Sequence, residues 1–180
     1  LGNSLAFSFL IRPCEILTLT SIEIGILLNK YFKDRLYLKW PNDILNSKLY
    51  KCGGILCQLV SKKYLIVGVG INYGNSNKDN FQFPYPVGSV FENQELEDID
   101  YQNIPKEIYR YILDNRMKPK KVISEWDNCC VHKDQDVKII DGETSTEGIF
   151  KKINQDGAAI LDIKGVEKAI MCGSLFITLK

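Results

Sequence analysis

Three short segments of this 180-residue chain carry side chains that could act together chemically. The first is Lys-Trp-Pro-Asn-Asp at residues 39–43, and the second is Lys51 with the glycine pair Gly53-Gly54 just after it. The third is Gly-Val-Gly-Ile-Asn at residues 68–72, which ends an apolar run. Cations, a carboxylate, amides and glycines are the groups needed to hold a magnesium-bound nucleotide beside a carboxylic acid.

Adenylation of a carboxylic acid sets clear demands on such a site. A carboxylate oxygen must be held in line with the α-phosphate of ATP, and cations must meet the charge that builds there. Asn42 and Asp43 follow a proline that ends a strand, so their side chains could project into a cleft and serve phosphate and Mg²⁺. The glycines at 68 and 70 would let a flat ligand lie against a strand, and Asn72 could reach a phosphate.

Each segment also has a plain structural explanation. An Asn-Asp pair after proline can form an Asx turn that caps the backbone, and Lys51 could be a solvated lysine in a turn. Lys39 could be a surface cation at a strand end, and residues 68–72 could be an ordinary buried strand with a turn asparagine. The combination of the three segments favours a shared site over these separate explanations.

Composition excludes several classes of function. A net charge of +1 argues against a duplex nucleic-acid binder, and no apolar run reaches the ~20 residues that span a bilayer. None of the six cysteines has C-x-x-C spacing, which fits free thiols in a reducing compartment, the cytoplasm or a plastid or other organellar stroma. His132 is the only histidine, so neither a hydrolytic triad nor a zinc cluster is indicated. Trp40 and Trp126 are expected to be packing residues.

Hydrophobic periodicity predicts the elements that must position these segments. Strands are expected at 5–11, 36–40 and 43–45 and as a hairpin at 54–60 and 64–71, whose second strand should be wholly buried. Helices are expected at 16–32, 104–113 and 119–129. Residues 74–100 should form a long surface loop with its aromatic side chains folded back on the domain. Short alternating strands at 137–140, 147–153, 158–163 and 169–179 predict a small barrel, with a domain boundary near 131–135.

In this order, the three segments resemble the core of biotin protein ligases, enzymes that adenylate biotin and pass it to a lysine of a carrier protein. The strand ending at Arg12-Pro13 and the helix after it also match that family. The resemblance implies an α+β fold: a mixed β-sheet with helices, of the class II aminoacyl-tRNA synthetase and biotin ligase type. This catalytic domain would cover residues 1–132, and a small Src-homology-3-like β-barrel would cover residues 133–180.

The resemblance also implies roles for individual residues. Lys51 would be catalytic, contacting both biotin and the activated phosphate. The remaining candidates are Gly54, Leu56 and Gly70 for the biotin slot, Asn42, Asp43, Asn72 and Lys39 for ATP and its phosphates, and Asp43 for Mg²⁺. The ligands would be ATP, Mg²⁺ and biotin as substrate, with biotinyl-adenylate as the intermediate. The partner would be a biotin carboxyl carrier domain; a homodimer is an option, and no membrane or nucleic-acid partner is expected.

The family also carries an Arg- and Gly-rich loop upstream of the strand that begins here. Because the chain starts at Leu1, we expect an N-terminally truncated ligase with little or no adenylation activity by itself. A lipoate–protein ligase shares the fold and a similar lysine segment, but Trp-Pro-Asn-Asp and the terminal β-domain favour biotin. A non-catalytic biotin- or adenylate-binding module is a further alternative, as is a structural protein in which the segments are only turns.

Overall fold

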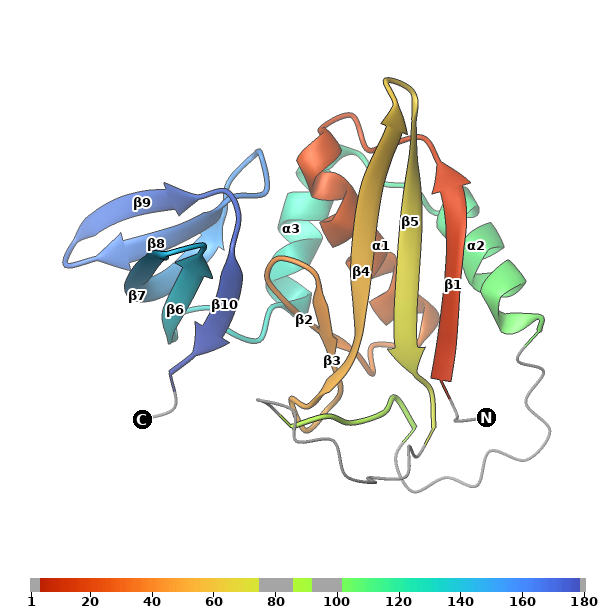
Figure 1. Cartoon of the computed structure of the whole chain (residues 1–180), viewed down its shortest axis with the longest axis horizontal. Helices are drawn as coiled ribbons and strands as arrows, with labels where there is room; N and C mark the ends of the chain where they lie inside the picture. Colours follow the sequence, from red (N-terminus) through yellow and green to blue (C-terminus); the bar gives the residue numbers. More distant parts are fainter. Residues whose placement is uncertain (1–3, 75–85, 92–101, 179–180) are drawn as a thin grey trace.

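The computed structural model describes residues 4–74, 86–91 and 102–178, and it contains two five-stranded sheets (Figure 1). The N-terminal sheet has the strand order β1-β5-β4-β3-β2. Its strands are β1 (Ser4–Ile11), β2 (Tyr37–Lys39), β3 (Asp43–Leu45), β4 (Lys51–Ser61) and β5 (Tyr64–Asn72). All ladders in this sheet are antiparallel, and parallel pairing is confined to isolated bridges such as Leu38–Cys130 and Lys51–Val87.

Three helices lie on one face of the N-terminal sheet (Figure 1). They are α1 (Thr20–Tyr31), α2 (Ile104–Asp114) and α3 (Pro119–Cys129). A 3₁₀ turn, η1 (Leu17–Leu19), precedes α1, so the helix begins later than its apolar pattern predicted. The central helix α1 contacts β4 as well as α2 and α3, which explains why it is apolar on most of its circumference.

No helix among the described residues covers the opposite face of the sheet, and β5 shows the consequence. Leu65 and Val67 are buried on the helix side, whereas Tyr64 and Ile66, at the alternate positions, are exposed. The expectation of a wholly buried strand is therefore wrong for β5. Its apolar run is continuous because one set of side chains packs in the core and the alternate set lies on the uncovered face.

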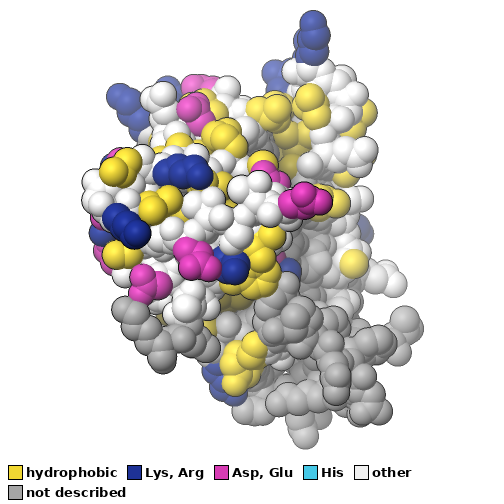
Figure 2. Space-filling model, turned by 60° about the vertical axis from the view of Figure 1, so that its left-hand side comes forward, with side chains coloured by type: hydrophobic (Ala, Val, Ile, Leu, Met, Phe, Trp, Pro, Cys, Tyr) yellow, Lys and Arg dark blue, Asp and Glu magenta, His cyan; other side chains and the backbone are white. Residues whose placement is uncertain are grey.

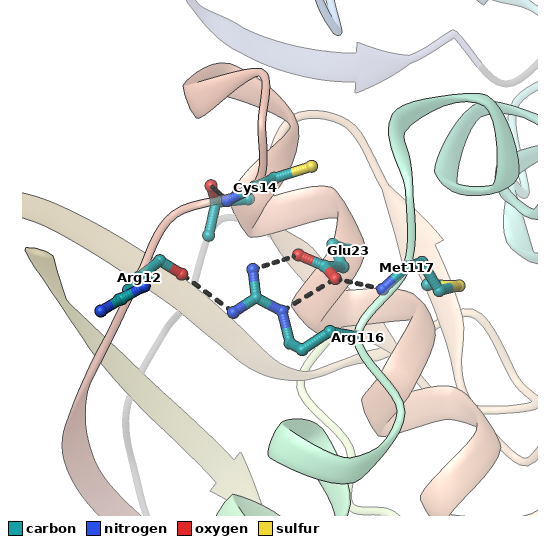
Figure 3. Close-up of polar contacts among 6 residues, drawn as sticks. Arg12, Cys14, Glu23, Arg116 and Met117 are labelled. Atoms are coloured by element: carbon teal, nitrogen blue, oxygen red, sulfur yellow. Dashed lines mark hydrogen bonds and ion pairs between the residues drawn. The ribbon is translucent and has the colours of Figure 1, made fainter. Parts of the chain in front are cut away.

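A buried ion pair joins three elements behind the sheet (Figure 3). The carboxylate of Glu23 on α1 is fully buried and accepts two hydrogen bonds from Arg116, at 2.9 and 2.8 Å. It also accepts the N–H of Met117 at 2.7 Å, while Arg116 donates to the carbonyl of Arg12 at 2.9 Å. The end of β1, the helix α1 and the connection between α2 and α3 are thus held at one point.

The C-terminal sheet has the strand order β10-β6-β7-β8-β9, again antiparallel. Its strands are β6 (Asp136–Asp141), β7 (Thr144–Ile153), β8 (Ala159–Ile163), β9 (Val166–Ile170) and β10 (Ser174–Ile177). The predicted strand 169–179 is split in two, because Gly173 turns the chain with a φ of +129°. Among the described residues β9 and β10 do not pair, so the sheet is barrel-like but not closed.

The two sheets meet along β2 and the residue after it. The carbonyl of Leu38 accepts the N–H of Val131 at 3.3 Å. Lys39 Nζ donates to the carbonyl of Leu175 at 2.8 Å. Trp40 Nε1 donates to the carbonyl of Gly157 at 3.0 Å, and the Trp40 ring is buried, as expected of a packing residue. The division into domains at residues 132 and 133 stays a prediction, because buried apolar contacts continue across both sheets.

The exposed side of the C-terminal sheet carries charges of both signs, interspersed with apolar side chains (Figure 2). Two cross-strand ion pairs on this sheet are Lys138–Glu147 at 3.3 Å and Lys152–Glu167 at 3.4 Å. The face in this view therefore has no extended region of one charge. None of the described helices is long and apolar enough to cross a membrane.

Part of the predicted surface loop is instead integrated into the fold. Residues 88–90 of the described stretch 86–91 are buried, and the stretch pairs with Lys51 through a bridge at Val87. Phe91 packs against Tyr73 with ring centroids 4.9 Å apart. The prediction about the aromatic residues at positions 81, 83 and 85 lies outside the described residues.

Candidate functional site

A row of directly paired residues crosses all five strands of the N-terminal sheet. In strand order it runs Ala6, Gly70, Gly54, Asp43 and Lys39. Paired residues of neighbouring strands project to the same face of a sheet. The strand register therefore places Ala6, Gly70 and Gly54, which have little or no side chain, on the same surface as the carboxylate of Asp43 and the ammonium group of Lys39.

The small residues of this row form the floor of a pocket of about 420 Å³. Leu56 contributes an apolar side chain to its lining and is 70% exposed. Asn42, Asp43 and Lys51 complete the lining at one end. The pocket thus offers a flat apolar floor with polar groups at one end, which suits an apolar ligand carrying a single acid group.

The glycines in this region have different physical roles. A Cβ on Gly53 would lie 2.5 Å from the carbonyl oxygen of Gly70, so the close approach of β4 and β5 requires glycine there. A Cβ on Gly54 would meet only the carbonyl of Asn42, at an ordinary 3.7 Å, and a Cβ on Gly70 would meet nothing within 4 Å. The fold does not require glycine at 54 or 70, so their missing side chains leave space above the sheet.

Asp43 holds two lysines at the polar end of the pocket. Its Oδ2 lies 2.8 Å from Lys39 Nζ, and its Oδ1 lies 2.5 Å from Lys51 Nζ. Burial of Asp43 opposes ionisation, but hydrogen bonds from Lys39 and Lys51 outweigh it and keep the pKa of the carboxyl below its ordinary value. Two cations and one carboxylate leave a net positive charge, which favours an anionic ligand.

A second, smaller pocket of about 220 Å³ is also lined by this ion-pair cluster. Lys39, Asn42, Asp43 and Lys51 line it from the N-terminal sheet, and residues 173–176 line it from the C-terminal sheet. Asn42, Asp43 and Lys51 therefore border both pockets. An acid bound in the first pocket and a polyphosphate bound in the second would meet at this cluster.

The donor set fits magnesium only as a companion of the nucleotide. Both oxygens of Asp43 already accept from lysines, and the described residues contain no cluster of three or more potential metal ligands. Mg²⁺ commonly binds through one or two carboxylates together with substrate phosphates and water. Asp43 could provide one such ligand to Mg²⁺ that arrives with ATP.

Two asparagines predicted for the site have structural partners as well. Asn42 donates from Nδ2 to the carbonyl of Ile55 at 2.8 Å, which ties the start of β3 to β4 while the residue still borders both pockets. Asn72 lies outside the lining of these two pockets. Its Nδ2 donates to the carbonyl of Gly88 at 3.1 Å, and its Oδ1 accepts the hydroxyl of Ser4 at 3.2 Å.

The structure adds residues that sequence reasoning missed. Residues 173–176 enter the polar pocket from the far end of the chain, and no side-chain motif marks them. Ala6 lies in the pocket floor, and the small residues at alternate positions of β1 (Ser4, Ala6 and Ser8) were an available signal for it. His132 is fully buried against Phe150, with ring centroids 4.2 Å apart, so it is a core residue.

No protein-family model matches the chain. The bifunctional ligase/repressor BirA of Escherichia coli (strain K12) is 25% identical to it over 168 residues, which covers 86% of this chain and 51% of BirA. The chain thus spans about half the length of the curated relative it matches.

Solved structures match over nearly the whole chain. Biotin protein ligase from Aquifex aeolicus in complex with biotin and ATP has a TM-score of 0.78 at 25% identity, covering 98% of this chain and 79% of that chain. A biotin protein ligase-like protein of unknown function from Silicibacter sp. shares the fold, with a TM-score of 0.71 at 13% identity over 94% of this chain and 80% of that chain. Sequence and fold thus point to the same relatives, and the chain is similar to biotin protein ligases in both.

Proposed function

We propose that this protein is a biotin–protein ligase, which adenylates biotin with ATP and transfers it to a specific lysine of a biotin carboxyl carrier domain. The observation that carries the proposal is the Asp43–Lys51 ion pair, which lies where an apolar-floored pocket meets a polar one. The Aquifex aeolicus relative was solved with biotin and ATP, the two small substrates that the proposal requires.

In the first step a carboxylate oxygen of biotin would attack the α-phosphorus of ATP. An acyl–phosphate bond forms, the bond to the β-phosphate bridging oxygen breaks, and pyrophosphate leaves. Lys51 would neutralise the charge that develops on the α-phosphate, and Asp43 would hold the lysine in place. In the second step the neutral amine of the carrier lysine attacks the acyl carbon, AMP leaves, and the nitrogen loses a proton as the amide forms.

The two pockets would divide the substrates between them. The fused rings of biotin would lie over Gly54 and Gly70, with Leu56 as an apolar wall. The β- and γ-phosphates, with their Mg²⁺, would lie among Lys39, Asn42 and Asp43, and Asp43 could bind the metal. Asn72 is a further proposed phosphate contact, and its amide would have to leave Gly88 to make it.

The deciding experiment is ATP–pyrophosphate exchange by the full-length gene product, with biotin and lipoate compared side by side. Exchange that depends on biotin would support the proposal. Exchange that depends on lipoate would move the protein to lipoate ligation, and tight biotin binding without exchange would identify a non-catalytic module.

Lys51 can be tested directly in the same assay. We expect Lys51→Ala to lower the rate of biotin-dependent exchange by about 10²–10³-fold, because a pre-positioned charge at the reacting phosphate is lost. Lys63→Ala, which removes the same charge from the hairpin turn after β4, is the matched control and should be neutral. A Lys51→Ala protein as active as the control would remove Lys51 from the mechanism.

A further inference from the structure

The 86–91 segment holds the backbone of Lys51 on the edge that faces away from β3. The N–H of Lys51 donates to the carbonyl of Pro86, and the N–H of Gly88 donates to the carbonyl of Lys51, both at 3.0 Å. On the opposite edge Lys51 pairs with Leu45 of β3. The main chain of Lys51 is therefore held between two neighbours, although its side chain is 39% exposed.

Two asparagine amides fasten this segment from different elements. Asn72, at the end of β5, donates to the carbonyl of Gly88 and accepts the N–H of Val90 at its own carbonyl, at 3.1 and 2.8 Å. Asn46 donates from Nδ2 to the carbonyl of Ser89 at 3.0 Å. Since Gly88, Ser89 and Val90 are buried, these bonds are shielded from competition by water.

Asn46 also builds the turn that leads into Lys51. Its Oδ1 accepts the N–H groups of Lys48 and Tyr50 at 3.0 and 3.1 Å, and its own N–H donates to the carbonyl of Tyr50 at 3.0 Å. The residue is only 2% exposed. One side chain therefore shapes the approach to Lys51 with its oxygen and binds the 86–91 segment with its nitrogen.

The chain contains a second turn of the same design. Asn154 accepts the N–H groups of Asp156 and Ala158 at Oδ1, both at 2.9 Å, and its N–H donates to the carbonyl of Ala158 at 3.0 Å. Such a turn uses only the side-chain oxygen and the main chain. The bond from Asn46 Nδ2 to Ser89 is thus an addition that the turn itself does not need.

We propose that Asn46 is a positioning residue for adenylation, which acts through the 86–91 segment to fix the backbone of Lys51. A lysine side chain has a flexible stem, so the place of its ammonium depends on where the backbone is anchored. Displacement of about 1 Å that originates outside the reacting groups can cost ~10²-fold in rate. The inference rests on the proposed function, in which Lys51 is the catalytic cation.

The test compares Asn46→Asp with Asn154→Asp. Aspartate keeps the oxygen that each turn needs but replaces the amide donor, so only Asn46→Asp loses the bond to Ser89. We expect kcat for biotin-dependent pyrophosphate exchange to fall by about tenfold or more in Asn46→Asp, with the KM for biotin little changed. Asn154→Asp should match the parent. Amide hydrogen exchange at Lys51 and Gly88 should accelerate only in Asn46→Asp.

Other outcomes would contradict either the positioning role of Asn46 or the proposed function. Equal rates and equal amide exchange in the two variants would overturn the positioning role. If the parent shows no exchange with biotin or lipoate, the proposed function fails, and the amide-exchange comparison still tests whether Asn46 holds Lys51.

A second variant, Asn72→Asp, tests the anchoring of the segment if Asn46→Asp does not fold. If Asn46→Asp is unfolded at the assay temperature, Asn72→Asp removes the other amide bond to the segment and keeps the oxygen that accepts the Ser4 hydroxyl. It should accelerate exchange of the Gly88 amide relative to Asn154→Asp. Unchanged exchange there would contradict the anchoring of the segment.

Discussion

Asp43 organises the polar end of the site with a single carboxylate shared by Lys39 and Lys51. Its folded pKa lies below the ordinary value of 3.8, so the unfolded chain binds more protons in acid. The stability that these ion pairs contribute is therefore fully present above that value and is lost only as the pH falls through the lower folded pKa. At neutral pH the cluster keeps its charge pattern, and a nucleotide would meet two cations already in place.

Gly70 and Gly53 separate the needs of the ligand from those of the fold. Gly70→Val should raise the KM for biotin by about tenfold or more, because a side chain would enter the pocket floor, while the thermal midpoint changes little. Gly53→Ala should instead lower stability by about 2 kcal/mol, since its Cβ would lie against the carbonyl of Gly70. Enzyme kinetics and thermal unfolding of the two variants check both expectations.

The same two variants, Gly70→Val and Gly53→Ala, could contradict these assignments. A Gly70→Val protein that binds biotin as tightly as the parent would show that biotin does not lie over β5. A Gly53→Ala protein with parental stability would show that β4 and β5 can separate without cost at this point.

At the scale of elements, the Glu23–Arg116 pair is the polar contact that joins β1, α1 and the α2–α3 connection (Figure 3). Glu23→Ala should lower the free energy of unfolding by about 3 kcal/mol, because removal of one partner leaves buried donors without an acceptor. Glu125→Ala, which breaks the more exposed pair with Lys30, should cost about 1 kcal/mol or less. Urea unfolding of both variants makes the comparison.

A double-mutant cycle between Glu23→Ala and Arg116→Met isolates the interaction itself. A coupling energy near zero would mean that the carboxylate is held by the Met117 N–H and by packing, and that the guanidinium contributes little. The distinction matters for the site, because β1 carries Ala6 into the pocket floor and α1 supports β4 from behind.

At the scale of the whole molecule, His132 lies buried where α3 and the C-terminal sheet meet, beside Trp126 and Phe150. Burial lowers its pKa from 6.5 to about 3, so between these values the unfolded state binds more protons and stability rises with pH. We expect a loss of about 2 kcal/mol between pH 7 and pH 5. Urea unfolding at both pH values, repeated with His132→Phe, tests this: the variant should lose less stability than the parent.

A parent and a His132→Phe variant with the same pH dependence would show that other groups govern acid unfolding. A shallower dependence in the variant would assign the loss to this junction. Since residues 173–176 line the polar pocket from the C-terminal sheet, loosening of the junction in acid should also weaken nucleotide binding.

Local patterns in the sequence determined much of this protein. Apolar periodicity predicted all three helices and most strands, because burial of one face depends on residues close together in the chain. The residue types at 39–43, 51–54 and 68–72 indicated nucleotide and acid chemistry. The last predicted strand failed because Gly173 and its left-handed φ are a local turn that apolar patterning does not detect.

Only the tertiary structure decided which of these residues share a surface. The row from Ala6 through Gly70 and Gly54 to Asp43 depends on strand register, and a shift of one residue would move any of them to the helix face. The polar pocket likewise needs residues 173–176 beside Lys39, and Lys51 needs the 86–91 segment beside it. These pairings join segments far apart in the chain, and packing of the whole molecule selects them, whereas sequence patterns report only on neighbours.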